Sequence, residues 1–182
     1  MMGPEEIKKT FDDADCLYSY QDVSQAFDEM ACAMHDKLHD KNPLMLCVVN
    51  GGIIPMGHLM TRLHFPLQID YIHATRYRGA TSGGTLKWLV KPSFPLKDRV
   101  VVIVDDVLDK GITLDELIKF CKVEGVKEVY SAVLVEKEQD RPFDIKADFT
   151  GLKTVNRYLF GFGMDYKDYL RNADGIYAVK GM

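Results

Sequence analysis

The clearest candidate for chemistry in this chain is a cluster of three acids followed by a glycine and a threonine. Its members are Asp105, Asp106, Asp109, Gly111 and Thr113. Carboxylates accept hydrogen bonds from sugar hydroxyls and are ligands that Mg²⁺ prefers. Backbone N–H groups at a glycine turn and at the start of a helix attract phosphate. The cluster therefore predicts a site for a sugar phosphate.

The residues on either side of the cluster predict the elements that position it. Val100–Val104 contains four valines and one isoleucine, which is typical of a strand buried on both faces of a parallel sheet. Beyond Thr113, apolar residues recur at helical spacing: Leu114, Leu117, Ile118 and Cys121. The acids would then lie at the carboxyl end of a central strand, where open α/β sheets bind ligands. The alternative is an acidic turn with a threonine N-cap and no ligand.

Length and composition are those of an ordinary globular chain. With 182 residues, 47% hydrophobic and 27% charged, we expect a single domain spanning residues 1–182. The net charge of −4 argues against a nucleic-acid partner. The N-terminal residues do not resemble a secretory signal, no apolar run would span a membrane, and the four cysteines lack C-x-x-C spacing. These features predict a cytoplasmic protein with reduced, mostly buried thiols.

Strand and helix patterns alternate along the chain, which predicts an α/β fold with a central, mostly parallel sheet flanked by helices. Ser19 and Asp22 have the spacing of a capping box before a helix over 22–40. The other expected strands lie at 44–49, 67–71, 86–90 and 129–135, with a helix over 53–63. The tail predicts a strand from 158, a short helix over 166–170 and a strand over 176–179. Residues 78–85, with three glycines, predict a mobile loop.

Several motifs carry a family resemblance. The segment VVIVDDVLDKGITL resembles the 5-phosphoribosyl-1-pyrophosphate (PRPP) motif of type I phosphoribosyltransferases. Three further segments, in the same order as in that family, resemble its 6-oxopurine branch, the hypoxanthine-guanine phosphoribosyltransferases: Leu134–Lys137, Asp148–Gly151 and Arg157–Tyr166. The resemblance covers roughly residues 15–180.

The resemblance implies a type I phosphoribosyltransferase fold with a core over about 40–150. A small hood would come from the N-terminal segment and about 151–182. It also implies a purine-salvage pentosyltransferase that transfers the phosphoribosyl group from PRPP to hypoxanthine or guanine, giving IMP or GMP and pyrophosphate. Mg²⁺ would be required, and the protein would be a homodimer or homotetramer. No nucleic acid or membrane would be a partner.

For PRPP, the resemblance assigns roles to residues from three segments. Asp105 and Asp106 would hold the ribose hydroxyls, and together with Asp165 would meet the metal, partly through water. The 5-phosphate would be bound by a loop whose members are Asp109, Lys110, Gly111, Ile112 and Thr113. The pyrophosphate would be held by Asn50, Gly51 and Arg171.

For the purine, Asp109 would be the base at N7 and Lys137 would donate to O6. Tyr158 would stack on the ring, while the backbone of Leu159 and the Asp165 region would meet the group at C2. Residues 78–85 would form a lid, beside which Arg76 and Tyr77 would close over the site.

Three departures from the family pattern stand out. Asn50 occupies a position where many relatives have lysine, and Arg76 replaces a serine. Lys110 and Ile112 replace a common threonine and lysine, although binding by backbone amides should tolerate this change. The sequence does not rank hypoxanthine, guanine and xanthine. The alternative from another class is a nucleotide-sensing RNA-binding regulator on the same fold, which would need a local basic face.

Overall fold

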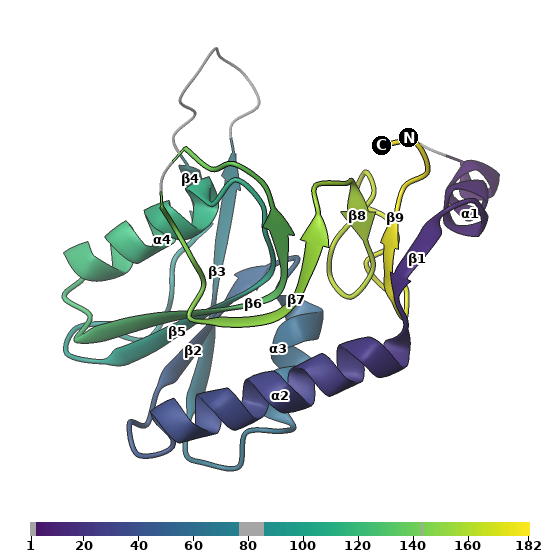
Figure 1. Cartoon of the computed structure of the whole chain (residues 1–182). Helices are drawn as coiled ribbons and strands as arrows, with labels where there is room; N and C mark the ends of the chain where they lie inside the picture. Colours follow the sequence, from purple (N-terminus) through teal and green to yellow (C-terminus); the bar gives the residue numbers. More distant parts are fainter. Residues whose placement is uncertain (1–2, 77–85, 143) are drawn as a thin grey trace.

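The main body of the protein is a six-stranded, mostly parallel sheet (Figure 1). The computed structural model describes residues 3–76, 86–142 and 144–182. The strand order is β4-β3-β2-β5-β6-β7, and β4 alone among these runs antiparallel to its neighbour. The strands are β2 (Leu44–Val49), β3 (Gln68–Arg76), β4 (Leu86–Val90), β5 (Val100–Leu108), β6 (Glu128–Glu138) and β7 (Phe149–Val155). The expected α/β fold with a mostly parallel sheet is confirmed.

The central strand β5 is buried on both faces because helices cover both sides of the sheet. Val100, Val102 and Val104 pack into the cluster that includes α2 (Tyr20–Leu38) and α3 (Ile53–Met60). The alternate residues Val101 and Ile103 pack into the cluster beneath α4 (Ile112–Val123). This alternation is the period of two that a strand imposes on its side chains, and it leaves the end of β5 as the place where polar residues appear.

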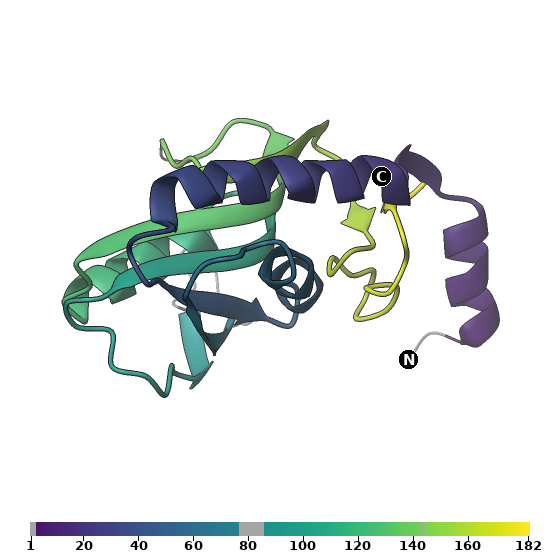
Figure 2. The ribbon, with the colours of Figure 1, turned by 90° about the horizontal axis from the view of Figure 1, so that it is seen from below.

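Helix α2 begins with the predicted capping box. The Ser19 hydroxyl accepts a hydrogen bond from the Asp22 amide at 3.3 Å, and the Ser19 amide donates to the Asp22 carboxylate at 2.8 Å. The helix then runs along both parts of the molecule, from a second, smaller sheet to the large sheet (Figure 2).

The smaller sheet joins the two ends of the chain in the antiparallel order β1-β9-β8. Its strands are β1 (Asp15–Tyr18), β8 (Leu159–Phe160) and β9 (Ile176–Ala178). Helix α1 (Pro4–Asp12) lies at its outer side, where Phe11 contacts Phe160 and Tyr177. This small sheet is the hood, and it stands beside the carboxyl ends of β5 and β6 (Figure 1).

Some predictions of elements were wrong. Residues 166–170 form tight turns rather than a short helix, because Lys167, Asp168 and Leu170 have φ angles of 51°, 71° and 64°. Helix α4 begins at Ile112 with Gly111 as its N-cap, so Thr113 is its second residue rather than its cap. The elements α1, β1 and β7 were not predicted from the sequence.

Other expectations are only partly met, or lie outside the described residues. Cys47 and Cys121 are buried, but Cys16 and Cys32 are exposed; all four are thiols. Among the described residues, no helix is long and apolar enough to cross a membrane. The predicted mobile loop over 78–85 lies outside the described residues.

Candidate active site

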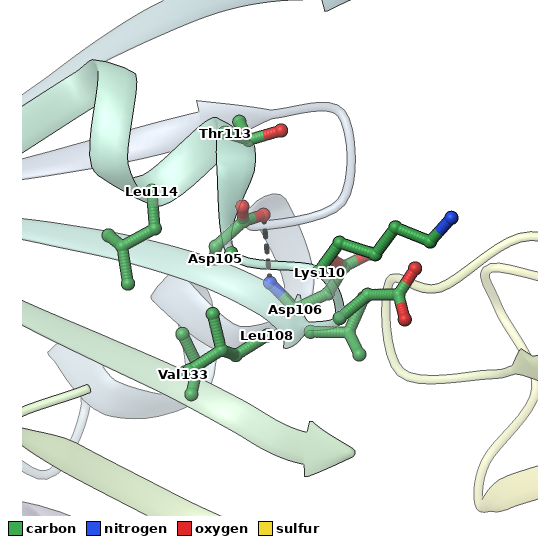
Figure 3. A pocket seen from close by; sticks show the side chains of 10 residues that line it. Asp105, Asp106, Leu108, Lys110, Thr113, Leu114 and Val133 are labelled. Carbon is green, nitrogen blue, oxygen red and sulfur yellow. Dashed lines mark hydrogen bonds between the residues drawn. The ribbon is translucent and has the colours of Figure 1, made fainter. Parts of the chain in front are cut away.

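The two adjacent acids Asp105 and Asp106 lie near the end of β5, in a setting poor in water. The Asp106 amide donates a hydrogen bond to the Asp105 carboxylate at 2.9 Å (Figure 3). Burial raises the pKa of the Asp105 carboxyl well above its usual value, and the neighbouring Asp106 charge raises it further. Burial also raises the pKa of Asp106. The pair is therefore suited to taking up hydroxyl donors or a cation that would offset the cost of two buried charges.

A cavity of about 230 Å³ lies between these acids and the start of α4. It is lined by Asp105, Asp106, Val107, Leu108, Asp109, Lys110, Gly111, Thr113, Leu114 and Val133. The Lys110 side chain extends outward from it (Figure 3). Because the first N–H groups of a helix have no partner within the helix, the opening of α4 suits an anion here.

Gly111 is required at the turn into α4 for two reasons. Its φ is 77°, in the left-handed region that favours glycine. In addition, a Cβ at this position would clash with the Ile145 side chain. The tight turn brings the backbone of the loop close to the cavity.

A second cavity, of about 370 Å³, adjoins the first and reaches the hood. It is lined by Asp106, Val107, Asp109, Lys137, Tyr158, Leu159, Met164 and Asp165. Three of these residues, Asp106, Val107 and Asp109, also line the first cavity. Tyr158 is 41% exposed, and its ring centroid lies 5.5 Å from that of Tyr166 in an edge-to-face arrangement, so an exposed aromatic residue lines the cavity.

Asp109 lies on the boundary between the two cavities and is contacted by the end of β6. The Gln139 side-chain amide donates a hydrogen bond to Asp109 Oδ1. The Lys137 ammonium lies 3.7 Å from the same oxygen and is 13% exposed, whereas the Asp109 side chain is 44% exposed. A charged acceptor and a charged donor thus face the second cavity together.

Arg171, from the loop before β9, joins the hood to the acids of β5. Its guanidinium contacts Asp165 at 2.7 Å and donates to the Gly163 carbonyl at 2.6 Å. The Asp106 carboxylate lies 4.0 Å away. This cation therefore stands between the acids of both parts of the site.

The turn after β2, at Asn50 and Gly51, lies against both the acids of β5 and the hood. A Cβ at Gly51 would clash with the Asp106 carboxylate, and a Cβ at Gly163 would clash with the Gly51 carbonyl. The peptide between Val49 and Asn50 is cis. The turn, the acids and the hood thus come together where only glycines fit.

The structure brings most of the predicted site residues to these two cavities and the turn beside them. Ile112 opens α4 directly after Gly111. Arg76 ends β3, but its side chain and the whole of Tyr77 lie outside the described structure.

Sequence reasoning missed three residues that hold the site together. Gln139 contacts the Asp109 carboxylate, Arg141 binds the carbonyl of Asp109 at 2.9 Å, and Ile145 packs over Gly111. They follow the Lys137 motif within eight residues, but that segment has no periodic pattern that could have marked them.

The fold and the site define a class of protein that binds a sugar phosphate at the end of the central strand of an α/β sheet. Residues 13–167 match the family model described as the phosphoribosyl transferase domain, and the chain belongs to this family. Hypoxanthine-guanine phosphoribosyltransferase of Streptococcus mutans is 30% identical over 180 residues, which cover 98% of this chain and 97% of that protein.

Two further comparisons agree. Hypoxanthine-guanine-xanthine phosphoribosyltransferase of Tritrichomonas foetus is 29% identical over 165 residues, 90% of each chain. A solved structure named hypoxanthine-guanine-xanthine phosphoribosyltransferase superposes with a TM-score of 0.85 at 27% identity, covering 93% of this chain and 99% of that one.

Proposed function

We propose that this protein is a purine-salvage enzyme that transfers the 5-phosphoribosyl group from PRPP to hypoxanthine or guanine. The observation that carries the proposal is the pair of adjoining cavities that share Asp106, Val107 and Asp109. One cavity has acids and a helix start, which suit a ribose 5-phosphate. The other has Lys137 and Tyr158, which suit a flat base with a carbonyl oxygen.

In the proposed reaction, N9 of the purine forms a bond to C1 of the ribose while the bond from C1 to the pyrophosphate oxygen breaks. The leaving pyrophosphate takes the electron pair of that bond. The purine then carries one proton too many, and the proton on N7 passes to the Asp109 carboxylate. The products are IMP or GMP, pyrophosphate and one proton.

Each remaining residue has a positioning or charge-stabilising role in this proposal. Lys137 donates to O6, Tyr158 stacks on the ring, and the Leu159 backbone with the Asp165 region meets the C2 position. The segment Asp109–Thr113 binds the 5-phosphate. Arg171 and the Asn50–Gly51 turn hold the pyrophosphate, where a fixed positive charge lowers the barrier to its departure.

Mg²⁺ fits the donor set at the end of β5. Asp105 and Asp106 are hard oxygen donors whose charges are costly to bury. Among the described residues, no group of three or more acids, histidines or cysteines forms a ready metal cage. Mg²⁺ is commonly held by one or two carboxylates together with waters and substrate phosphates, so a cage is not required. When bound, the ion would offset the charge of the pyrophosphate, and Asp165 would be a further donor once its contact with Arg171 opens.

An assay of the purified protein with PRPP and Mg²⁺ tests the function. We expect nucleotide product from hypoxanthine and guanine, with adenine as the negative control, and xanthine included to establish the range. The RNA-binding alternative gains no support from the net charge of −4 or from the names of the relatives. Absence of product with all four bases, together with salt-sensitive RNA binding, would replace the enzyme proposal with that alternative.

The proposal includes a cytoplasmic location and a homodimer or homotetramer. Self-association is supported by exposed apolar side chains on one face of β3 and β4, namely Ile69, Tyr71 and Val90. Exposed apolar side chains that share one face of a sheet can form part of a protein–protein interface. Light scattering after size exclusion would measure the assembly, and cell fractionation the location.

A further inference from the structure

Asp109, the proposed base, is hydrogen-bonded by a residue that lies outside the lining of both cavities. The Gln139 side-chain amide donates a hydrogen bond to Asp109 Oδ1. Among the described residues, no other side chain donates a hydrogen bond to this carboxylate, and Gln139 itself lines neither cavity. Lys137 is farther away, at 3.7 Å, and attracts the carboxylate as a charge rather than through a hydrogen bond.

Gln139 directly follows β6, which ends at Glu138, and lies two residues beyond Lys137. The side chains of Gln139 and Lys137 both reach the same oxygen of Asp109. The segment at the end of β6 therefore directs two donors at one carboxylate oxygen.

Arg141 fixes the backbone on which this contact depends. Its guanidinium donates to the carbonyls of Asp109 at 2.9 Å and Lys137 at 2.7 Å, and it binds the Glu136 carboxylate at 2.9 Å. With its side chain 13% exposed, Arg141 ties the end of β6 to the loop after β5. The Gln139 amide then meets an Asp109 whose main chain is already held.

We propose that Gln139 is a positioning residue for the transfer, one that keeps the Asp109 carboxylate aimed at the base cavity. The inference rests on the proposed function. When a purine binds, Lys137 would turn to O6 and give up its attraction to Asp109. Gln139 supplies a neutral donor that does not compete for O6, so Asp109 keeps an anchor on one oxygen while the other accepts the proton from N7.

The test is Gln139→Met, which keeps the length of the side chain and removes the donor. We expect kcat/KM for the purine to fall about tenfold, the scale of losing one hydrogen bond to a charged group. The KM for PRPP should stay within about twofold. Gln25→Met is the matched control, because Gln25 also donates to a carboxylate, that of Glu29 at 2.9 Å, on the far helix α2. Its kinetics should match those of the wild type.

A double-mutant cycle separates positioning from a general structural effect. In an Asp109→Asn background the base is already lost, so Gln139→Met should cause almost no further loss of kcat/KM for the purine. If the two losses multiply, or if PRPP and purine are affected equally, Gln139 acts on the fold and the proposal is overturned.

A second variant covers the case in which Gln139→Met fails to fold. Gln139→Glu keeps the shape but sets a second carboxylate against Asp109, and it should lose at least as much kcat/KM for the purine. Wild-type kinetics in Gln139→Glu would also overturn the proposal. Failure of the proposed function is distinguishable, since the wild-type protein itself would then yield no nucleotide with any base.

Discussion

At the scale of single residues, Asp109 has the most demanding role in the proposed reaction, because it would accept a proton while its neighbours would bind sugar, phosphate and base. It lies on the boundary of both cavities and is held on its side chain by Gln139 and on its carbonyl by Arg141. A carboxylate held in this way needs little reorganisation at the moment of transfer.

Replacement of this carboxylate by an amide should remove the proton acceptor and leave the loop backbone intact. We expect Asp109→Asn to lower kcat about a hundredfold or more, the scale of a positioned general base, with PRPP affinity nearly unchanged. Steady-state kinetics with both substrates measure this. Asp144→Asn is the control, because its side chain is 90% exposed on the neighbouring loop. Near-normal turnover in Asp109→Asn would remove Asp109 from this role.

The buried carboxyl of Asp105 should make the free energy of unfolding depend on pH. Burial raises the pKa of its carboxyl well above 3.8 in the folded protein. Ionisation therefore costs stability above the raised pKa. The cost shrinks as the pH falls below that pKa, and it is absent below the unfolded value of 3.8. Asp105→Asn keeps an oxygen that can accept from the Asp106 amide. At pH 7 without Mg²⁺ this variant should be more stable than the wild type, because it has no carboxylate charge to bury.

Urea unfolding at pH 7 and at mildly acidic pH, in the presence of a chelator, checks this. The difference between Asp105→Asn and the wild type should shrink as the pH falls, and stabilisation by Mg²⁺ with PRPP should be lost in the variant. A variant less stable than the wild type at pH 7 would show that the Asp105 charge is already compensated within the protein.

The loop between β5 and α4 is the clearest case at the scale of elements, because its geometry depends on Gly111. Gly111→Ala would place a Cβ at a φ of 77° and against Ile145. We expect a loss of about 1–3 kcal/mol in the free energy of unfolding, together with weaker PRPP binding. Gly57→Ala in α3 is the matched control, since nothing lies within 4 Å of an added Cβ there.

The control Gly57→Ala should change the free energy of unfolding in the opposite direction. An alanine in the middle of a helix is favoured over glycine, so Gly57→Ala should stabilise by about 0.5–1 kcal/mol. Thermal or urea unfolding of both variants supplies the comparison. Equal effects of the two substitutions would mean that the left-handed turn at Gly111 is not required.

The elements that sequence predicts well are those whose signal is local. The valine run of β5 and the capping box before α2 each contain their own evidence within a few residues. The strand β1 has four residues and depends on pairing with β9 more than 150 positions later, so no local pattern could indicate it. The turns over 166–170 were mistaken for a helix because apolar spacing does not reveal positive φ angles.

In the site, too, features with a local sequence pattern could be predicted, whereas contacts between distant residues could not. The acids of β5 and the Lys137 motif could be recognised because each is a short segment with a characteristic pattern. The contact between Gln139 and Asp109 joins residues 30 positions apart, and the ion pair between Arg171 and Asp165 depends on the tight turns between them. Such contacts follow from the arrangement of the hood against the sheet, which no single segment encodes.

The site as a whole is formed by two sheets that meet at the end of β5. The large sheet supplies the acids and Lys137, and the hood supplies Tyr158, Leu159 and Asp165. Gly51 and Gly163 let the two parts come into backbone contact. We propose that the two adjoining cavities are halves of one site, one for the phosphoribosyl group and one for the purine.

A crystal structure of the protein with bound IMP would test this proposal. We expect the 5-phosphate on the backbone of Lys110–Thr113 and the ribose hydroxyls at Asp105 and Asp106. The purine should lie on Tyr158 with O6 within hydrogen-bond distance of Lys137. A nucleotide bound in the opposite direction, or outside both cavities, would contradict it.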